Sequence, residues 1–439
     1  MILFYNFIFL IIAVIYFVLY LLRGKFHRGF MPRLGIMPRG LALDRPIWIH
    51  AVSVGEAVSV KAFIESLRKA YPDKKLVIST VTPSGNKIAK TIARNDDFVT
   101  YLPLDFSFTV KAGIGRINPF LFIIVETEIW PNLISYLYTR DIPIIVINGR
   151  ISDRSFRKYR MIRWLLKPIL NRINLWCVQS SLDAQRLISL GLAQDKVKVT
   201  GNMKFDNTDC LDFKKSDDGR DLKIKLGLTT PGSKLLVAGS THPGEEEIIL
   251  KAYKKLLSGF PQLKLLIAPR HPERAKEIER IVSRYGVSPI RVSQLASLPV
   301  CQLNQSTGQP VNRQTVLILD TIGELMSFYR IADIVFVGGS LIKKGGHNIL
   351  EPASLAKPIL FGPYMFNFRD ITELFLKDNA CILVHNEEEL YAAIKELLDS
   401  PSKIASLGRK ARDLIGQNQG AINRNLELIK KYFYEKAGL

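Results

Sequence analysis

Acidic side chains follow two apolar segments in the first half of the chain, at points where buried strands are expected to end. Glu56 closes residues 50–56 (HAVSVGE), and Glu126 and Glu128 open residues 126–132 (ETEIWPN). A carboxylate near a helix N-terminus is held ionised by the helix field and can take a proton from a hydroxyl group. Glu56 is therefore a candidate general base, although its position also suits a residue that only caps the next helix.

The two carboxylates of residues 126–132 lie on the same side of an extended chain but diverge once it turns into a helix. Either Glu126 or Glu128 could therefore face a substrate. No cluster of Asp and His accompanies them, so the pattern predicts no metal site. Lys204, in residues 201–206 (GNMKFD), follows another expected strand and could stabilise a developing negative charge. A solvated linker lysine is the alternative.

Four strand-to-helix turns in the second half carry groups that suit a nucleotide. In residues 345–360 (GGHNILEPASLAKPIL), Asn348 is expected to cap a short helix, and Glu351 could accept hydrogen bonds from ribose hydroxyls. Arg270, in residues 269–274 (PRHPER), could make a bidentate contact to phosphate. The other two turns are residues 239–245 (GSTHPGE) and 321–325 (TIGEL). Four such turns on one sheet edge predict a nucleotide pocket.

These turns belong to a regular alternation of short apolar strands and amphipathic helices, which predicts an α/β fold with two doubly wound, Rossmann-like domains. The expected strands are residues 47–52, 76–80, 99–102, 121–125, 144–147, 175–178 and 197–200, then 235–238, 263–267, 316–319, 334–337 and 358–360. Ligands of such domains bind at the carboxyl ends of the strands, so a site in the cleft between the domains is expected. No GxGxxG motif supports a dinucleotide.

The N-terminus has the pattern of a membrane anchor. Residues 1–22 are apolar and uncharged, and their length suffices to cross a bilayer as a helix. Basic residues follow at once, which by the positive-inside rule puts the rest of the chain in the cytoplasm. The expected organisation is a transmembrane signal-anchor at 1–22, a basic juxtamembrane linker at 23–45, an N-terminal domain at 46–205, a linker at 206–223 and a C-terminal domain at 224–439. Residues 287–314 have few periodic cues.

The net charge of +21, from 61 Lys and Arg against 40 Asp and Glu, favours anionic partners. Eight basic residues interleaved with bulky apolar ones crowd one segment: Arg150, Arg154, Arg157, Lys158, Arg160, Arg163, Lys167 and Arg172. In an anchored protein this pattern favours contact with anionic headgroups over RNA, and no RNA-binding signature is present. The four cysteines form no CxxC pair, which predicts neither a zinc knuckle nor a disulfide framework.

Taken together, these motifs resemble the Kdo transferase family, which adds 3-deoxy-D-manno-octulosonic acid (Kdo) to lipid A precursor. The resemblance rests on HAVSVGE, ETEIWPN, GNMKFD, PRHPER and HNILEP (residues 347–352), in the family's order and over nearly the whole chain. It implies a glycosyltransferase B fold and an inverting transfer of Kdo from CMP-Kdo to lipid IVA, in the inner core of lipopolysaccharide. It implies no cofactor and no metal.

The resemblance also implies residue roles. Glu56 matches the general base, and Glu126 and Lys204 match positions that assist the transition state. The implied CMP contacts are Pro269, Arg270, Ile322, Gly323, Glu324, Asn348, Ile349, Leu350 and Glu351. The implied location is the bacterial inner membrane, with one N-terminal span, cytoplasmic catalytic domains and the anionic membrane surface, rather than nucleic acid, as partner. Two alternatives remain: a sugar-nucleotide epimerase of the same fold, and a membrane-tethered RNA-binding protein.

Overall fold

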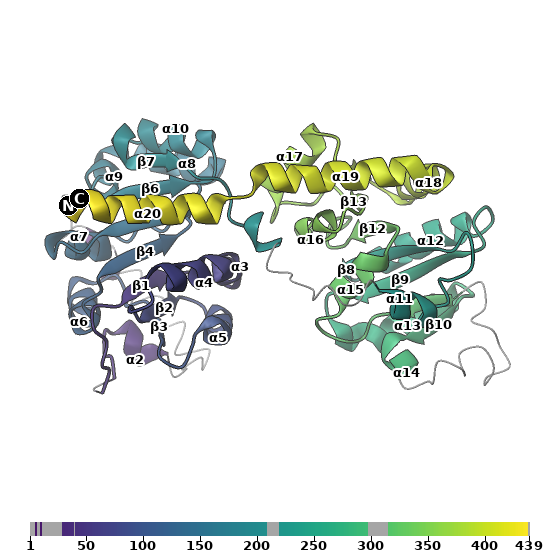
Figure 1. The fold of residues 1–439 in the computed structure, drawn as a ribbon, viewed down its shortest axis with the longest axis horizontal. Coiled ribbons are helices and arrows are strands. Elements are labelled where there is room, and N and C mark those ends of the chain that lie inside the picture. The colour runs from purple at the N-terminus through teal and green to yellow at the C-terminus, as the bar shows by residue number, and fades with distance from the viewer. Residues whose placement is uncertain are drawn as a thin grey trace. The chain divides into compact units, whose positions relative to one another are not determined.

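A computed structural model describes residues 5–6, 9–10, 29–38, 40–208, 219–296 and 315–437. The chain divides into two compact units. Unit 1 comprises Met1–Cys210 and Asn418–Leu439, and unit 2 comprises Leu211–Gln417. Each unit is built on its own parallel sheet (Figure 1).

The described part of unit 1 forms a seven-stranded sheet in the order β3-β2-β1-β4-β5-β6-β7, with every pair parallel. The chain therefore winds outward from β1 on one side and resumes at β4 on the other, which makes the β1/β4 boundary the switch point. The strands are β1 (Ile47–His50), β2 (Leu76–Thr80), β3 (Phe98–Tyr101), β4 (Leu121–Val125), β5 (Ile144–Gly149), β6 (Leu175–Val178) and β7 (Val197–Val199).

Helices cover both faces of this sheet, because side chains from alternate strand positions enter two separate cores. Trp48 and Phe122 lie in one core, and Ile49 and Ile123 lie in the other. The helices are α2 (Phe30–Arg33), α3 (Val54–Ser59), α4 (Lys61–Ala70), α5 (Pro83–Ile92), α6 (Ser107–Ile117), α7 (Pro131–Thr139), α8 (Asp153–Met161), α9 (Arg163–Leu170), α10 (Ser181–Ser189), η1 (Gln194–Lys196), η2 (Asp206–Thr208) and α20 (Ala421–Ala437).

The described residues of unit 2 repeat the design, with the parallel order β10-β11-β9-β8-β12-β13-β14 and a switch point between β8 and β12. The strands are β8 (Lys234–Thr241), β9 (Leu263–Pro269), β10 (Ser288–Arg291), β11 (Thr315–Ile318), β12 (Ile334–Val337), β13 (Ile359–Phe361) and β14 (Ile382–Leu383). The helices are α11 (Arg220–Lys225), α12 (Glu245–Leu256), η3 (Pro272–Arg274), α13 (Ala275–Arg284), α14 (Val292–Ala296), α15 (Leu325–Ile331), α16 (Leu350–Ser354), α17 (Arg369–Lys377), α18 (Glu387–Asp399) and α19 (Pro401–Asn418).

The predicted C-terminal domain, 224–439, is wrong at its end, because the last helix belongs to unit 1. The carboxylate of Asp206 accepts hydrogen bonds from the backbone N–H groups of Gly420 (2.7 Å) and Ile422 (2.6 Å), and so caps α20. Helix α20 lies beside the helices of unit 1 (Figure 1). It contacts α4, and its apolar face, including Ile422 and Ile429, completes the core there. Burial of this face holds the helix on unit 1.

Several predictions fall on residues that the structure does not describe. Nearly all of the expected anchor, residues 1–22, lies outside the described residues, as do 209–218 of the expected linker and 297–314 of the polar segment. Within the part of the chain that is described, no helix combines the length and apolar content needed to cross a bilayer.

Candidate functional site

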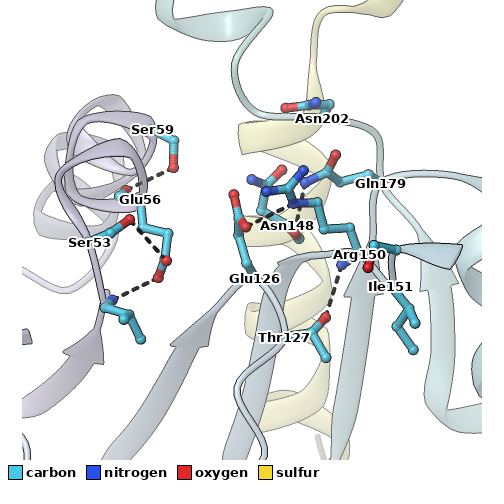
Figure 2. A network of polar contacts seen from close by, with 12 residues as sticks. Ser53, Glu56, Ser59, Glu126, Thr127, Asn148, Arg150, Ile151, Gln179 and Asn202 are labelled. Carbon is cyan, nitrogen blue, oxygen red and sulfur yellow. Dashed lines mark hydrogen bonds and ion pairs between the residues drawn. The ribbon is translucent and has the colours of Figure 1, made fainter. Parts of the chain in front are cut away.

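The acidic motifs of unit 1 meet at the switch point of its sheet. Strands β1 and β4 are neighbours and parallel, with His50 paired to Ile124, so the loops that follow them leave the same edge side by side. Glu56 lies in the first turn of α3, after β1, and Glu126 directly follows β4. Figure 2 shows the side chain of Glu126 between those of Glu56 and Arg150. The structure therefore brings together two residues that the sequence singled out separately.

Glu56 is tied to the backbone at the start of its helix. Its carboxylate accepts hydrogen bonds from the N–H of Val52 (2.7 Å) and the hydroxyl of Ser53 (3.1 Å). Burial raises the pKa of Glu56 to about 7; the Val52 N–H opposes this, and the charges of Glu126 and Glu128 add to it. Glu56 thus caps the helix and is also a carboxylate that titrates near neutrality, the range in which a general base works best.

Glu126 is held in an uncommon backbone conformation. Its φ of 60° lies in the left-handed region, which costs a non-glycine residue about 1–3 kcal/mol and recurs at functional sites. Its carboxylate accepts a hydrogen bond from Nε of Arg150 (2.9 Å), and its N–H donates to the carbonyl of Ile147 (2.9 Å). The N–H of Arg150 in turn donates to the hydroxyl of Thr127 (3.0 Å). These bonds fix the carboxylate at the exit of β4 and β5.

Glu128 has a different environment from Glu126. It is half-buried, and burial together with the charge of Glu126 raises its pKa to about 7. Its own charge contributes to a raised pKa of Tyr159 on α8, so this tyrosine lies close by. Three carboxyl groups therefore lie at one edge of the sheet. In the part of the chain that the structure describes, only Glu126 of the three forms an ion pair with an arginine.

Asn148 is a site residue that the sequence reasoning missed. It is fully buried, has φ of 53°, and accepts a hydrogen bond on Oδ1 from the N–H of Met203 (3.1 Å). Its Nδ2 has no hydrogen-bond partner among the described residues. Asn148 thereby links the exit of β5 to the loop of Lys204, a half-buried residue whose N–H donates to Oδ1 of Asn202 (3.0 Å). The Asn-Gly pair that ends β5 was the available signal, since both residues tolerate positive φ.

In unit 2 a buried acid joins the two loops at the switch point. The carboxylate of Glu245, on α12, accepts hydrogen bonds from the backbone N–H groups of Gly339 (2.6 Å), Ser340 (2.9 Å), Leu341 (2.9 Å) and His242 (3.0 Å). It therefore fixes the loop after β12 against the loop after β8. Glu245 was given no role from the sequence, because three of its four partners lie almost a hundred residues away.

Two histidines face each other across these loops. Nε2 of His242 lies 2.9 Å from Nε2 of His347, and the two rings are parallel within 4°. Burial, aided by the charge of Arg270, lowers the pKa of His347 to about 4. The side chain of Arg270 is exposed, while its N–H donates to the carbonyl of Thr241 (2.9 Å). A cation is thus presented beside two neutral imidazoles, which suits an anionic ligand.

The segment 348–351 differs slightly from its prediction. The N-cap of α16 is Ile349 rather than Asn348, although Oδ1 of Asn348 still accepts a hydrogen bond from the N–H of Leu350 (3.1 Å). Nδ2 of Asn348 donates to the carboxylate of Glu351 (3.1 Å). Burial raises the pKa of Glu351, against the hydrogen bond of Asn348 and the charge of Arg270. Since the side chains of Ile349 and Leu350 are buried, a ligand would meet their backbone.

The remaining predicted nucleotide contacts lie at the ends of β9 and β11. Pro269 is buried at the end of β9, and Ile322 is 88% exposed after β11. Gly323 has φ of 91°, and Glu324 accepts a hydrogen bond from the hydroxyl of Thr321. Strands β11, β9, β8 and β12 are consecutive in the sheet, so all the predicted turns leave one edge.

Arg274, in the same motif as Arg270, has a structural environment instead. Its Nη1 donates to the buried carboxylate of Glu246 (2.8 Å), while Nε and Nη2 bind Glu277 (3.0 Å each). No group of three or more His, Cys, Asp or Glu in the described ranges is arranged to hold a metal ion.

Comparison with known proteins identifies relatives of the chain. Residues 28–207 match the family model described as 3-deoxy-D-manno-octulosonic-acid transferase (kdotransferase). A 3-deoxy-D-manno-octulosonic acid transferase of Haemophilus influenzae is 36% identical over 389 residues, which cover 88% of this chain and 87% of the relative. The transferase of the same name from Chlamydophila psittaci is 29% identical over 413 residues, covering 93% and 90%.

Among solved structures, a UDP-GlcNAc 2-epimerase from Neisseria meningitidis bound to UDP-GlcNAc is similar in fold, with a TM-score of 0.57 at 14% identity, over 88% of this chain and 100% of that one. At this identity the likeness shows the fold alone. It agrees with the predicted class of two parallel-sheet α/β domains, which is consistent with a glycosyltransferase B type.

Proposed function

The chain belongs to the 3-deoxy-D-manno-octulosonic acid (Kdo) transferase family of lipopolysaccharide biosynthesis, and from that premise we propose that it transfers Kdo from CMP-Kdo to lipid IVA. One observation carries the proposal furthest. The motif acids Glu56 and Glu126, far apart in sequence, lie side by side at the switch point of unit 1 (Figure 2). Such an edge is where doubly wound sheets bind their ligands.

We infer that Glu56 is the general base. Its carboxylate takes the proton of the acceptor hydroxyl as the oxygen attacks the anomeric carbon of Kdo. The bond from that carbon to the CMP phosphate breaks, CMP leaves with the electron pair, and the configuration inverts. A pKa of about 7 suits the role, because about half of the carboxyl groups are ionised at neutral pH and the carboxylate is basic enough to accept the proton.

Two further residues of unit 1 are inferred to stabilise the transition state. The anomeric centre gains positive character as the donor bond breaks, and Glu126 offers a fixed carboxylate to it. The leaving phosphate gains negative charge, for which Lys204 is the inferred cation. The hydrogen bond from Arg150 supports this role for Glu126, since it fixes the carboxylate before substrate binds.

The donor is inferred to bind along the edge of the sheet of unit 2. The exposed guanidinium of Arg270 is suited to the CMP phosphate, and Glu351, oriented by Asn348, is suited to the ribose hydroxyls. Pro269, the turn Ile322-Gly323-Glu324 and the backbone of Ile349 and Leu350 would complete the nucleotide contacts. The reaction as written needs no cofactor or metal.

The lipid acceptor gives the membrane a role. We infer that residues 1–22 form a single span in the bacterial inner membrane, with both units in the cytoplasm and the anionic membrane surface, rather than nucleic acid, as partner. Tethering raises the effective concentration of enzyme at the surface where the acceptor lies.

The proposal is tested by incubating the full chain in detergent with CMP-Kdo and lipid IVA and measuring the mass of the lipid product by mass spectrometry. We expect lipid IVA to gain the mass of Kdo and CMP to be released. The rival activity is that of a sugar-nucleotide epimerase. Conversion of UDP-GlcNAc without lipid, together with no Kdo-modified lipid, would establish the epimerase instead.

A further inference from the structure

The turn between α8 and α9 presents apolar side chains to solvent. Met161 is 81% exposed, Ile162 is 41% exposed and Trp164 is 77% exposed, and Arg163 between them is exposed as well. We refer to residues 161–164 as the elbow. Exposing a tryptophan and a methionine within one short turn to water is costly unless the surface meets an apolar partner.

The apolar side chains of the elbow are not needed to fill the core of unit 1, because other residues of α8 and α9 already do so. Phe156 and Tyr159 already pack α8 against the core of unit 1, and Leu166 and Ile169 do so for α9. The elbow therefore adds a second apolar surface on the outer side of a segment whose inner side is satisfied. Ile162, which lies between α8 and α9, has φ of −111° and ψ of 23°, so the helix is interrupted at this surface.

Exposed cations flank the elbow along the chain. The exposed basic residues of this segment are Arg154, Arg157, Lys158, Arg160, Arg163 and Lys167. Asp153, the acid at the start of α8, is paired with Arg186. The two outermost basic residues of the predicted segment have other contacts: Arg150 binds Glu126, and Arg172 lies over the ring of Tyr138. Exposed Lys and Arg interleaved with exposed Trp, Met and Ile are typical of a surface that enters an anionic lipid interface.

We propose that the elbow inserts Met161, Ile162 and Trp164 into the boundary between headgroups and acyl chains of an anionic bilayer. The same helix reaches the acidic edge of unit 1. Tyr159, two residues before Met161, packs against the same core as Ile129, the neighbour of Glu128, and α8 begins three residues after Arg150, the partner of Glu126. The elbow is therefore also the place where a lipid acceptor enters unit 1, a statement that rests on the proposed function.

The test measures the depth of Trp164 in the bilayer. The full chain is reconstituted in vesicles of phosphatidylethanolamine and phosphatidylglycerol, with and without bromine on the acyl chains. Trp48 and Trp176 are buried and Trp130 is half-buried, so Trp164 is the tryptophan best placed to be quenched. We expect brominated lipid to quench wild-type emission and Trp164→Phe to lose most of that quenching.

A matched control uses an exposed aromatic residue of unit 2. Phe366 is 60% exposed, so Phe366→Trp in the Trp164→Phe background places an exposed tryptophan in the other unit. We expect this variant to regain emission without regaining the quenching. Equal quenching of wild type and Trp164→Phe would overturn the proposal, and so would a change in Trp164 emission with RNA but none with brominated lipid.

A second variant separates the elbow from the chemistry. In Met161→Ser/Trp164→Ser, which changes exposed positions, we expect KM for lipid IVA in vesicles to rise roughly tenfold or more with kcat nearly unchanged. An unchanged KM would overturn the acceptor-entry role. Quenching at Trp164 in a chain that makes no Kdo-lipid would leave the lipid insertion standing and refute the proposed function, so the two failures are distinguishable.

Discussion

Replacing Glu56 by Gln should stabilise unit 1 at high pH, because it removes a carboxylate whose ionisation opposes folding. Burial raises the pKa of Glu56 from 4.5 to about 7. A carboxyl group whose pKa is higher in the folded chain than in the unfolded chain contributes its stability in full below pH 4.5. That contribution is lost as pH rises through about 7.

The size of the effect follows from the two pKa values. At about 1.4 kcal/mol for each pKa unit, the wild type loses up to about 3 kcal/mol of unfolding free energy between pH 4 and pH 9 through this group. Glutamine does not titrate, yet its carbonyl oxygen can still accept the hydrogen bond from the N–H of Val52. The unfolding free energy of the variant should therefore increase relative to that of the wild type as pH rises, with most of the increase between pH 5 and pH 8.

Urea unfolding followed by tryptophan emission is the suitable assay, because all four tryptophans of the chain (Trp48, Trp130, Trp164 and Trp176) belong to unit 1. The quantity to compare is the difference in unfolding free energy between variant and wild type at pH 5 and pH 9. If Glu56 only caps α3, the variant should instead be less stable by the same 0.5–2 kcal/mol or so at both values. A pH-independent loss of that kind would refute the reasoning.

Three further predictions concern neighbouring groups. Glu128→Gln should move the acidic limb of the pH–rate profile to lower pH, since it removes a negative charge that raises the pKa of Glu56; an unmoved or raised limb would contradict this. Arg270→Ala should raise KM for CMP-Kdo roughly tenfold or more and leave urea unfolding unchanged. The control Arg274→Ala should instead lower the unfolding free energy of unit 2 by about 3 kcal/mol, because it leaves the buried carboxylate of Glu246 without its arginine. Equal effects of the two substitutions would refute this distinction. Asp206→Ala should lower the unfolding free energy of unit 1 by about 1–2 kcal/mol and make α20 susceptible to proteolysis. If α20 stays undigested in this variant, the cap is dispensable.

The strands were predictable because their signal is local. Continuous runs such as Leu121–Val125 and Ile334–Val337 are buried on both faces, and no helix of the same composition would be so short. Two strands escaped prediction. Ser288–Arg291 contains a proline and no apolar run, and Ile382–Leu383 is only two residues long; both lie at the edge of the sheet, where pairing depends on the neighbouring strand.

The arrangement of the site was only partly predictable. The positions of Glu56 and Glu126 at strand ends follow from the alternation, but their adjacency depends on the strand order, which places β1 beside β4. Glu245 and Asn148 were missed because their partners are distant in sequence. The packing of α20 on unit 1 was missed for the same reason, because its hydrogen bonds to Asp206 join residues more than two hundred positions apart.

The rate of product formation shows whether Glu56 acts as the general base of Kdo transfer in this chain. CMP-Kdo and lipid IVA are supplied at saturation to wild type and to Glu56→Gln at the same pH. We expect Kdo-modified lipid from the wild type and a rate at least about a hundredfold lower from the variant, because the variant lacks the general base. A rate near that of the wild type in Glu56→Gln would contradict that role.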